Sequence, residues 1–512
     1  MEGKSISCII GALLINLTLG TFYSISNVIP YIASYMRRKG NPDVTTEHGA
    51  WITATFLLGQ GLFIIAGSLV EQKFNSRIAC ILGCVLHSSS TFLAIWALDQ
   101  SFLIFVLIYG LGSGLGCGSA YMASIIAAQK WFPQSKGIVT GIIVAGFGLG
   151  GLIFTNLQTL YINPDNEPPS SSGYFGESVY NKVPNLFLYM GLIFAISQTV
   201  GCFLAYPAPE TTQTPKPTSP STNHVTVSED GLPNIRNFLS VFKFRIFYLI
   251  GAMMMLVAPG VTFVNSLGKR YGQAYIDDDR YLATVVAIAA VANALGRLTW
   301  GLLIDKFAFS TCFTIKVLLF SILIILFPFS FILESRTLYL IWMMGLFFGF
   351  SGTFVLFPVF IEQVFGDKYH GIIYGTLYLF LALASILASF VLQMTISTAL
   401  KESRNPDDSL MLRLGPCMMI ATLYICSLVL YVLMTPVARL ENAIRRKREM
   451  HVAKSRNTLF NRQDLYPLDR GTLAERTDTE STLQRENSLG SIVRFREVPH
   501  DDRKLYQLPK LN

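Results

Sequence analysis

The sequence has little charge for its length, and it lacks the motifs of soluble enzymes. Asp, Glu, Lys and Arg make up 14% of its 512 residues, whereas a soluble domain averages about 25%. An ordinary soluble fold is therefore excluded for most of the chain. No Gly-x-x-x-x-Gly-Lys-Ser/Thr loop occurs, so nothing supports ATP-driven transport. No nucleophile–base arrangement is readable in the loops, and we do not expect an enzyme.

Cysteine is also sparse. Most of the eight Cys residues fall within predicted helices, and no Cys-x-x-Cys pair occurs. Disulfides and a zinc site are therefore not expected, and neither a metal nor a cofactor is predicted. The net charge of +8 does not form a basic stripe interleaved with aromatic residues in a soluble domain. This argues against nucleic acid as a partner.

Long apolar runs dominate what is present. Hydrophobic residues make up 52% of the chain, and the mean hydropathy is +0.47. Runs of about 20 apolar residues are typical of membrane-spanning helices. The first run lacks a small-residue cleavage site, so we expect a retained helix. The sequence predicts an all-α integral membrane protein with spans near 7–35, 50–70, 78–97, 102–127, 138–160, 185–206, 245–267, 281–303, 312–333, 337–361, 371–398 and 411–434.

Two landmarks recur at one offset, which indicates an internal repeat. Glu71 ends Gly-Ser-Leu-Val-Glu after the second run and Asp305 ends Gly-Leu-Leu-Ile-Asp after the eighth, 234 residues later. Gly137 and Gly371 open the fifth and eleventh runs, again 234 apart. Transporters are often built from such structural repeats. We predict a six-helix half over 1–206, a flexible Pro/Thr/Ser-rich linker over 207–243, a second half over 244–436, and a mostly disordered tail over 437–512.

Basic residues predict the orientation. With both termini on the cytoplasmic side, that side carries eighteen Lys and Arg near the spans, Lys316 included, and the other carries eleven, Lys269 included. An excess of basic residues marks the cytoplasmic side. We therefore expect both termini in the cytoplasm, the bilayer as surroundings and the plasma membrane as the default location. An accessory membrane subunit or a kinase acting on the tail is left open.

Arg297 is the most informative residue, because it lies within an otherwise uncharged run long enough to cross a bilayer. A charged guanidinium at membrane depth is expensive and normally faces a polar cavity with a partner. Its fork suits a carboxylate. The alternative is an Arg that pairs with a neighbouring helix. Asn293 lies one turn before it on the same face and is predicted to orient the guanidinium.

Other polar residues within the runs are candidates for the cavity wall, although each also fits a helix–helix hydrogen bond. They include Tyr23, Asn27, Gln60, Tyr121, Tyr374 and Tyr378. No Asp or Glu lies in the middle of a predicted span, so no carboxylate proton relay is visible. Charged residues at the ends of the second and eighth runs are either ordinary interfacial pairs or a cytoplasmic gate. These are Glu71, Lys73, Arg77 and Asp305.

Glycines at four-residue spacing are predicted to let helices approach closely. The fourth run has Gly110, Gly114 and Gly118 on one strip and Gly112 and Gly116 on the next. The contact is either fixed packing or a sliding surface.

These motifs resemble the major facilitator superfamily. GSLVEQKF and GLLIDKF resemble its loop motif after the second helix of each half, with Glu71 where Asp is usual. The segments GLGSGLGCGSAYMASIIAAQKWFPQSKGIVTGIIVAGFGLGG, NALGRLTWGLLIDKF and FPVFIEQVFGDKYHGIIYGTLYLF resemble the oxalate/formate antiporter branch and its monocarboxylate porter relatives. The resemblance covers roughly residues 7–434.

The resemblance implies roles for particular residues. The family's carboxylate-binding arginine falls on Arg297, and a cavity aromatic of the family falls on Tyr378. Its eleventh-helix lysine, which pairs with the second carboxylate of oxalate, falls on Leu381. Burying a second negative charge without a partner would be expensive. We therefore expect a monocarboxylate transporter that works by alternating access, as an antiporter or a proton symporter. An amino-acid transporter of the same fold and a non-transporting metabolite sensor remain as alternatives.

Overall fold

The computed structural model describes residues 2–132, 136–170, 173–205, 238–273, 275–366, 369–402 and 406–433. Within these ranges the chain is helical and contains no strand. Most of the predicted linker and the whole predicted tail lie outside them.

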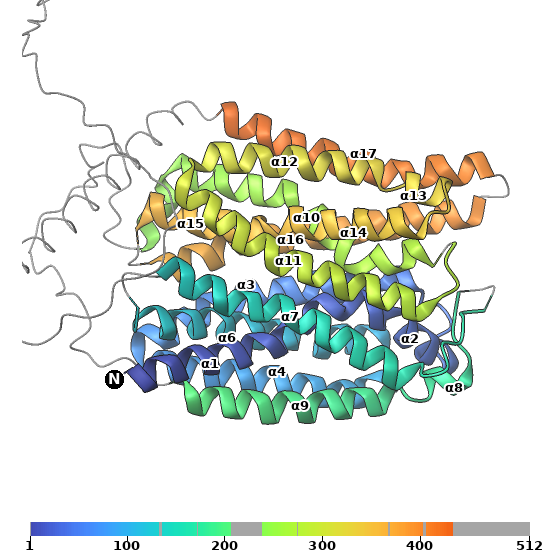
Figure 1. Cartoon of the computed structure of the whole chain (residues 1–512), viewed down its shortest axis with the longest axis horizontal. Coiled ribbons are helices and arrows are strands. Elements are labelled where there is room, and N and C mark those ends of the chain that lie inside the picture. The colour runs from blue at the N-terminus through green and yellow to red at the C-terminus, as the bar shows by residue number, and fades with distance from the viewer. Residues whose placement is uncertain are drawn as a thin grey trace, which may run out of the picture. The chain divides into compact units, whose positions relative to one another are not determined.

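The first half contains six membrane spans, and several are built from more than one helical segment. Figure 1 shows these helices in blue to green. In chain order they are α1 (Glu2–Leu19), η1 (Gly20–Ser24) and α2 (Ile25–Arg38); η2 (Thr46–His48) and α3 (Gly49–Lys73); α4 (Ser76–Leu98); α5 (Phe102–Phe105), η3 (Val106–Leu111) and α6 (Gly112–Gln129); α7 (Lys136–Ile162); and α8 (Glu177–Tyr180) and α9 (Val183–Leu204).

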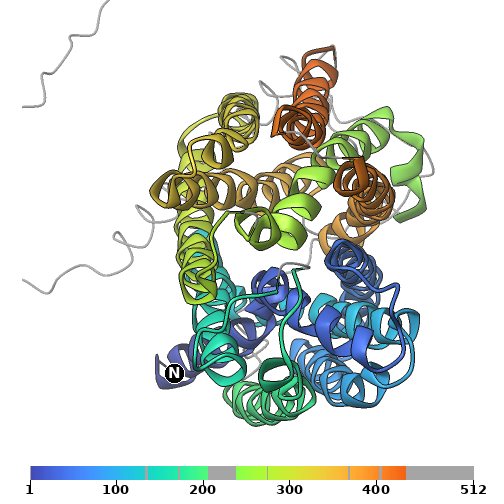
Figure 2. The same ribbon diagram turned by 90° about the vertical axis from the view of Figure 1, so that its right-hand side faces the viewer.

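The second half contains six more spans, preceded by the short helix η5 (Phe238–Lys243) at the end of the predicted linker. They are α10 (Arg245–Gly272); α11 (Asp279–Lys306); α12 (Phe309–Leu326) and α13 (Phe329–Ile332); α14 (Arg336–Ser351) and α15 (Thr353–Phe365); α16 (His370–Glu402); and α17 (Pro406–Leu433). All twelve predicted spans are confirmed, and their ends differ from the prediction by up to eight residues. Seen end-on in Figure 2, the helices of the two halves form two neighbouring groups.

Local sequence signals explain where several helices begin. Asn75 accepts a hydrogen bond from the Ile78 N–H at 2.9 Å, and Asp278 accepts one from the Tyr281 N–H at 3.0 Å. Such side chains satisfy backbone donors that have no partner within the helix. The outer faces carry exposed apolar residues, among them Leu103, Ile196 and Leu387. A bilayer, and not water, suits such a surface.

The glycine strips of α6 bring two neighbouring helices close, as predicted. A Cβ at Gly114 would collide with the carbonyl oxygen of Phe56 on α3, and one at Gly116 would collide with the backbone of His87 on α4. Both strips therefore hold helices of the same half together.

Other glycines lie where the two halves meet. A Cβ at Gly148 of α7 would come 2.5 Å from the Cβ of Ala294 on α11. One at Gly375 of α16 would come 2.7 Å from Cγ1 of Ile65 on α3. The α7–α11 and α16–α3 contacts between the halves therefore also depend on missing side chains.

Candidate functional site

Arg297 lies on α11 at the contact between the two halves, and only 4% of its surface is exposed. Three aromatic rings surround its guanidinium carbon: Tyr23 at 5.6 Å, Phe147 at 5.1 Å and Phe354 at 5.4 Å, measured to the ring centroids. Tyr23 and Phe147 come from the first half, and Phe354 comes from α15 of the second. The faces of aromatic rings attract cations, so the rings stabilise the guanidinium without neutralising it.

The hydrogen bonding of Arg297 is incomplete. Its Nη2 donates to the hydroxyl of Tyr23, whereas Nε and Nη1 are buried and have no hydrogen-bond partner within the described part of the chain. No described carboxylate forms an ion pair with it. Leaving a buried polar group unsatisfied costs about 1–3 kcal/mol, and more for a charged group. The site therefore has unused donors for an anion.

Tyr121 and Asn293, two of the other predicted cavity residues, each make a contact of their own. Tyr121 packs edge-on against Phe147, with 5.6 Å between the ring centroids. Asn293 donates from Nδ2 to the carbonyl of Phe347 at 3.2 Å. Its Oδ1 is buried without a hydrogen-bond partner among the described residues. No hydrogen bond joins Asn293 to Arg297 in this structure, so its predicted orienting role remains a prediction.

Tyr378 and Leu381 lie on α16, and both are buried. The hydroxyl of Tyr378 donates to Oε1 of Gln60 on α3 at 2.8 Å, which links the two halves. Its ring lies 6.3 Å from that of Phe354, which in turn contacts Arg297. Leu381 adds an apolar side chain where the resemblance places a lysine.

Three of the predicted gating residues, Glu71, Lys73 and Arg77, make contacts within the first half. Glu71 accepts hydrogen bonds from Lys130 and Ser76, and Arg77 donates from Nε to the carbonyl of Cys202 at 3.1 Å. Lys73 lies 5.4 Å from the ring of Phe74. These contacts join α3 to the end of α6, and α4 to α9. Asp305 lies exposed in the last turn of α11.

Two lysines assigned to the span flanks are instead fully buried. Lys316 lies inside the second half on α12, with its Nζ 4.5 Å from the ring centroid of Tyr424. Its Nζ has no hydrogen-bond partner within the described ranges. Lys269 lies in the last turn of α10 and pairs with Asp279, with 2.7 Å between Nζ and Oδ1. Placing both lysines at the water interface was wrong. Since one was counted on each side, the bias in basic residues is unchanged.

Asp279 was missed because the eighth span was predicted to begin at residue 281, whereas α11 begins at Asp279. Two signals could have found it. Three consecutive Asp residues, ending at Asp279, precede the apolar run, and acidic residues are typical of a helix start. In α10 no proline lies between Val261 and Lys269, so the sequence allows the helix to continue to the lysine.

Twelve apolar helices in two halves, with a buried cation between them, define a membrane transporter fold. The chain belongs to the Major Facilitator Superfamily, whose family model matches residues 12–389.

Particular relatives carry names that concern small organic anions. The chain is 28% identical over 437 residues to apicoplast pyruvate carrier 1 of Toxoplasma gondii, covering 72% of this chain and 80% of the carrier. It is 24% identical over 327 residues to the oxalate:formate antiporter of Oxalobacter formigenes, covering 62% and 69%. The xylose transporter of E. coli, in a partially occluded inward-open conformation, superposes with a TM-score of 0.60 at 14% identity, covering 84% of this chain and 99% of that one. At this identity the superposition supports the fold alone.

Proposed function

We propose that this protein is a secondary transporter that moves a small monocarboxylate across a membrane by alternating access. The observation that carries the proposal is the pair of unused donor groups, Nε and Nη1, on the buried guanidinium of Arg297. A carboxylate has two oxygens that match an arginine fork through parallel hydrogen bonds. Its charge also neutralises the cation, which otherwise stands alone between the halves.

The surroundings of Arg297 suit a small anion with an apolar body. The rings of Phe147 and Phe354 lie beside the guanidinium and offer an apolar surface to a short carbon chain. The hydroxyl of Tyr23 holds Nη2, which fixes the plane of the fork. Tyr121 packs edge-on against Phe147. In this proposal Tyr23, Tyr121, Tyr378 and Asn293 shape the pocket.

The single charge of the substrate follows from Leu381. A dicarboxylate would leave its second charge against an apolar, fully buried side chain, which is costly. A relative named for pyruvate fits this preference, and one named for oxalate and formate fits the wider class of small carboxylates.

Uptake into proteoliposomes tests the proposal. Labelled pyruvate, lactate, formate, oxalate and alanine would be offered to the wild type, Arg297→Ala and Arg297→Lys. Arg336→Ala is the matched control, since its side chain is 59% exposed. We expect uptake of the monocarboxylates that is abolished by Arg297→Ala and unchanged by the control. Undiminished uptake by Arg297→Ala would overturn the assignment.

The substrate panel also separates the alternatives. Oxalate uptake equal to that of pyruvate would refute the argument from Leu381, and preferred uptake of alanine would favour an amino-acid transporter. Binding without flux would favour a sensor. Uptake that is faster from vesicles preloaded with substrate indicates exchange, and uptake driven by a pH gradient indicates proton symport. The predicted cytoplasmic termini can be checked by labelling a tag at either end.

A further inference from the structure

Three polar residues line one side of the first span and reach the other half of the protein. Tyr23, Asn27 and Tyr31 follow one another at four-residue intervals, a spacing that places side chains on one face of a helix. Tyr23 accepts a hydrogen bond from Arg297. Asn27 and Tyr31 belong to α2. This helix lies towards the end of the bundle opposite the start of α1, which we call the distal end (Figure 1).

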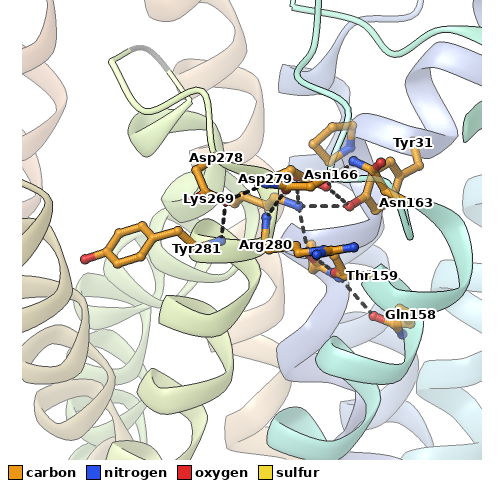
Figure 3. A network of polar contacts seen from close by, with 12 residues as sticks. Tyr31, Gln158, Thr159, Asn163, Asn166, Lys269, Asp278, Asp279, Arg280 and Tyr281 are labelled. Carbon is orange, nitrogen blue, oxygen red and sulfur yellow. Dashed lines mark hydrogen bonds and ion pairs between the residues drawn. The ribbon is translucent and has the colours of Figure 1, made fainter.

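At the distal end, Asn27 and Tyr31 contact a buried ion pair. Nζ of Lys269 donates to Oδ1 of Asn27 at 2.7 Å and to the hydroxyl of Tyr31 at 3.3 Å. The hydroxyl of Tyr31 donates to Oδ2 of Asp279 at 2.5 Å. Asn163, which directly follows α7, donates to the same oxygen at 2.9 Å. Figure 3 shows the Tyr31, Asn163 and Asp279 side chains gathered around Lys269.

The ion pair belongs to one half, and the groups that complete its hydrogen bonding belong to the other. Lys269 and Asp279 are 2.7 Å apart and both side chains are 0% exposed. They come from α10 and α11 of the second half, whereas Asn27, Tyr31 and Asn163 all come from the first. Lys269 forms an ion pair with Asp279 and donates hydrogen bonds to Asn27 and Tyr31, whereas Oδ1 of Asp279 accepts no hydrogen bond from the described residues. The hydrogen bonds that the two side chains do make within the described ranges all join them to the first half. These bonds therefore exist only while the two halves touch at this end.

The acceptor on Asn27 is held in place by its own half. Its Nδ2 donates to Oγ1 of Thr159 on α7 at 3.0 Å, so the amide oxygen faces Lys269. Nearer the surface, Arg270 adds a further contact between the halves, with 3.5 Å between its Nε and Oε1 of Glu47. The first half thus presents a prearranged polar surface to the ion pair.

A buried ion pair is stable only when both charges are present and the remaining hydrogen bonds are made. Removing one partner leaves an uncompensated charge in a dry interface, and water can reach that charge only if the halves separate. When both charges are removed, no uncompensated charge is left, and separation of the halves is no longer favoured by hydration of that charge.

We propose that Lys269, Asp279 and the first-half residues Asn27, Tyr31 and Asn163 form a distal gate, which closes only around the intact ion pair. The gate controls access to Arg297 from the distal side. This inference rests on the proposed function only in that the chain alternates access. It does not depend on which substrate is carried.

Accessibility of a reporter cysteine tests the gate without any substrate, so failure of the gate and failure of the proposed function are distinguishable. Ser266 of α10 is buried one turn before Lys269, and its hydroxyl donates to Thr53 of α3 at 2.8 Å, across the halves. The full chain carrying Ser266→Cys would be placed in nanodiscs and treated with a charged, membrane-impermeant maleimide. The chain without this substitution measures labelling of the native cysteines.

We expect Asp279→Asn to raise the labelling rate at least tenfold, because Lys269 is then an unpaired cation. The double variant Asp279→Asn with Lys269→Met should return to within about threefold of the parent, since no charge is left unpaired. Asp278→Asn is the matched control: it removes the same charge one residue earlier, where the side chain is 35% exposed, and should change nothing.

Two results would overturn the proposal. One is unchanged labelling in Asp279→Asn. The other is equally fast labelling in the single and double variants, which would mean that the residues act through packing and not through charge. If Asp279→Asn does not fold, as judged by size-exclusion chromatography, Lys269→Met alone takes its place, with the same two expectations.

Discussion

The second half of the protein buries two cations against the first half, and the two sites differ in what completes them. Lys269 has a carboxylate at 2.7 Å and acceptors from the opposite half. Arg297 has one hydroxyl, three aromatic rings and two unused donor groups. Among the residues that the structure describes, the protein supplies its own anion at the distal end and none at the centre. This contrast supports the proposal that the central site receives an anion from outside the chain.

A third cation shows that an unused donor alone does not define a site. Lys316 is fully buried with an unpartnered Nζ, but its ring contacts, Tyr424 and Phe313, belong to the same half. Arg297 is contacted by both halves. The position between the halves, together with the free donors, is what distinguishes the candidate substrate site.

Exchanging each of the two interface cations for methionine gives the largest expected difference. Lys269→Met should lower the free energy of unfolding by about 3–5 kcal/mol, because it leaves Asp279 as an uncompensated buried charge. Arg297→Met should not lower it, because no carboxylate loses its partner, although uptake should disappear. Thermal unfolding of the two purified variants measures the change in stability, and proteoliposome uptake measures the change in transport. Equal destabilisation by the two variants would contradict the view that Lys269 has an anionic partner within the protein and Arg297 has none.

Replacing Lys316 tests the third cation. Lys316→Met should raise the free energy of unfolding by about 1–4 kcal/mol, because it removes a buried charge that has no partner to lose. Uptake of pyruvate should persist. A loss of uptake with unchanged stability would instead indicate that Lys316 takes part in transport.

Adding a charge to the central site should change its preference. Leu381→Lys places an ammonium where the resemblance to the oxalate/formate antiporter branch expects one. The ratio of oxalate to pyruvate uptake should rise about tenfold, which corresponds to about 1.4 kcal/mol. Leu381→Met is the matched control with a similar length and no charge. If both variants shift the ratio alike, side-chain shape and not charge sets the preference.

We expect the smallest effect near the C-terminal end of α3, which belongs to the second span. Glu71 and Lys130 have side chains that are 10% and 40% exposed, and ion pairs at such positions contribute no more than about 1 kcal/mol. Glu71→Gln should therefore hardly change thermal unfolding. A clear change in uptake at unchanged stability would support the predicted gating role, whereas no change in either would reduce the pair to an ordinary contact.

The fold was predictable because the bilayer constrains it strongly. Spanning helices need long apolar runs, so the twelve spans could be read directly from the sequence. The role of the glycines was predictable for a similar reason. The spacing of Gly114 and Gly118 already implies one face, and both pack against α3.

The candidate site was predictable only in part. Arg297 stands out because its neighbours along the chain are apolar. The rings around its guanidinium include Phe147 and Phe354, and no local sequence pattern distinguishes these two phenylalanines from others. Lys269 and Asp279 were placed in a loop because charge usually marks the end of a span. Their burial depends on partners up to 248 residues away in the chain, Tyr31 among them, and such contacts are set by tertiary packing.

The ion pair at the distal end has a consequence for the response to membrane voltage. One elementary charge moved through 100 mV changes its free energy by about 2.3 kcal/mol, but Lys269 and Asp279 together carry no net charge. Opening and closing around them is therefore electrically silent. The central site carries the positive charge of Arg297 when no substrate is bound, and no net charge when a monocarboxylate is bound. Membrane potential should then act on the return of the empty carrier, and a pure exchanger, which reorients only when loaded, should be insensitive to it.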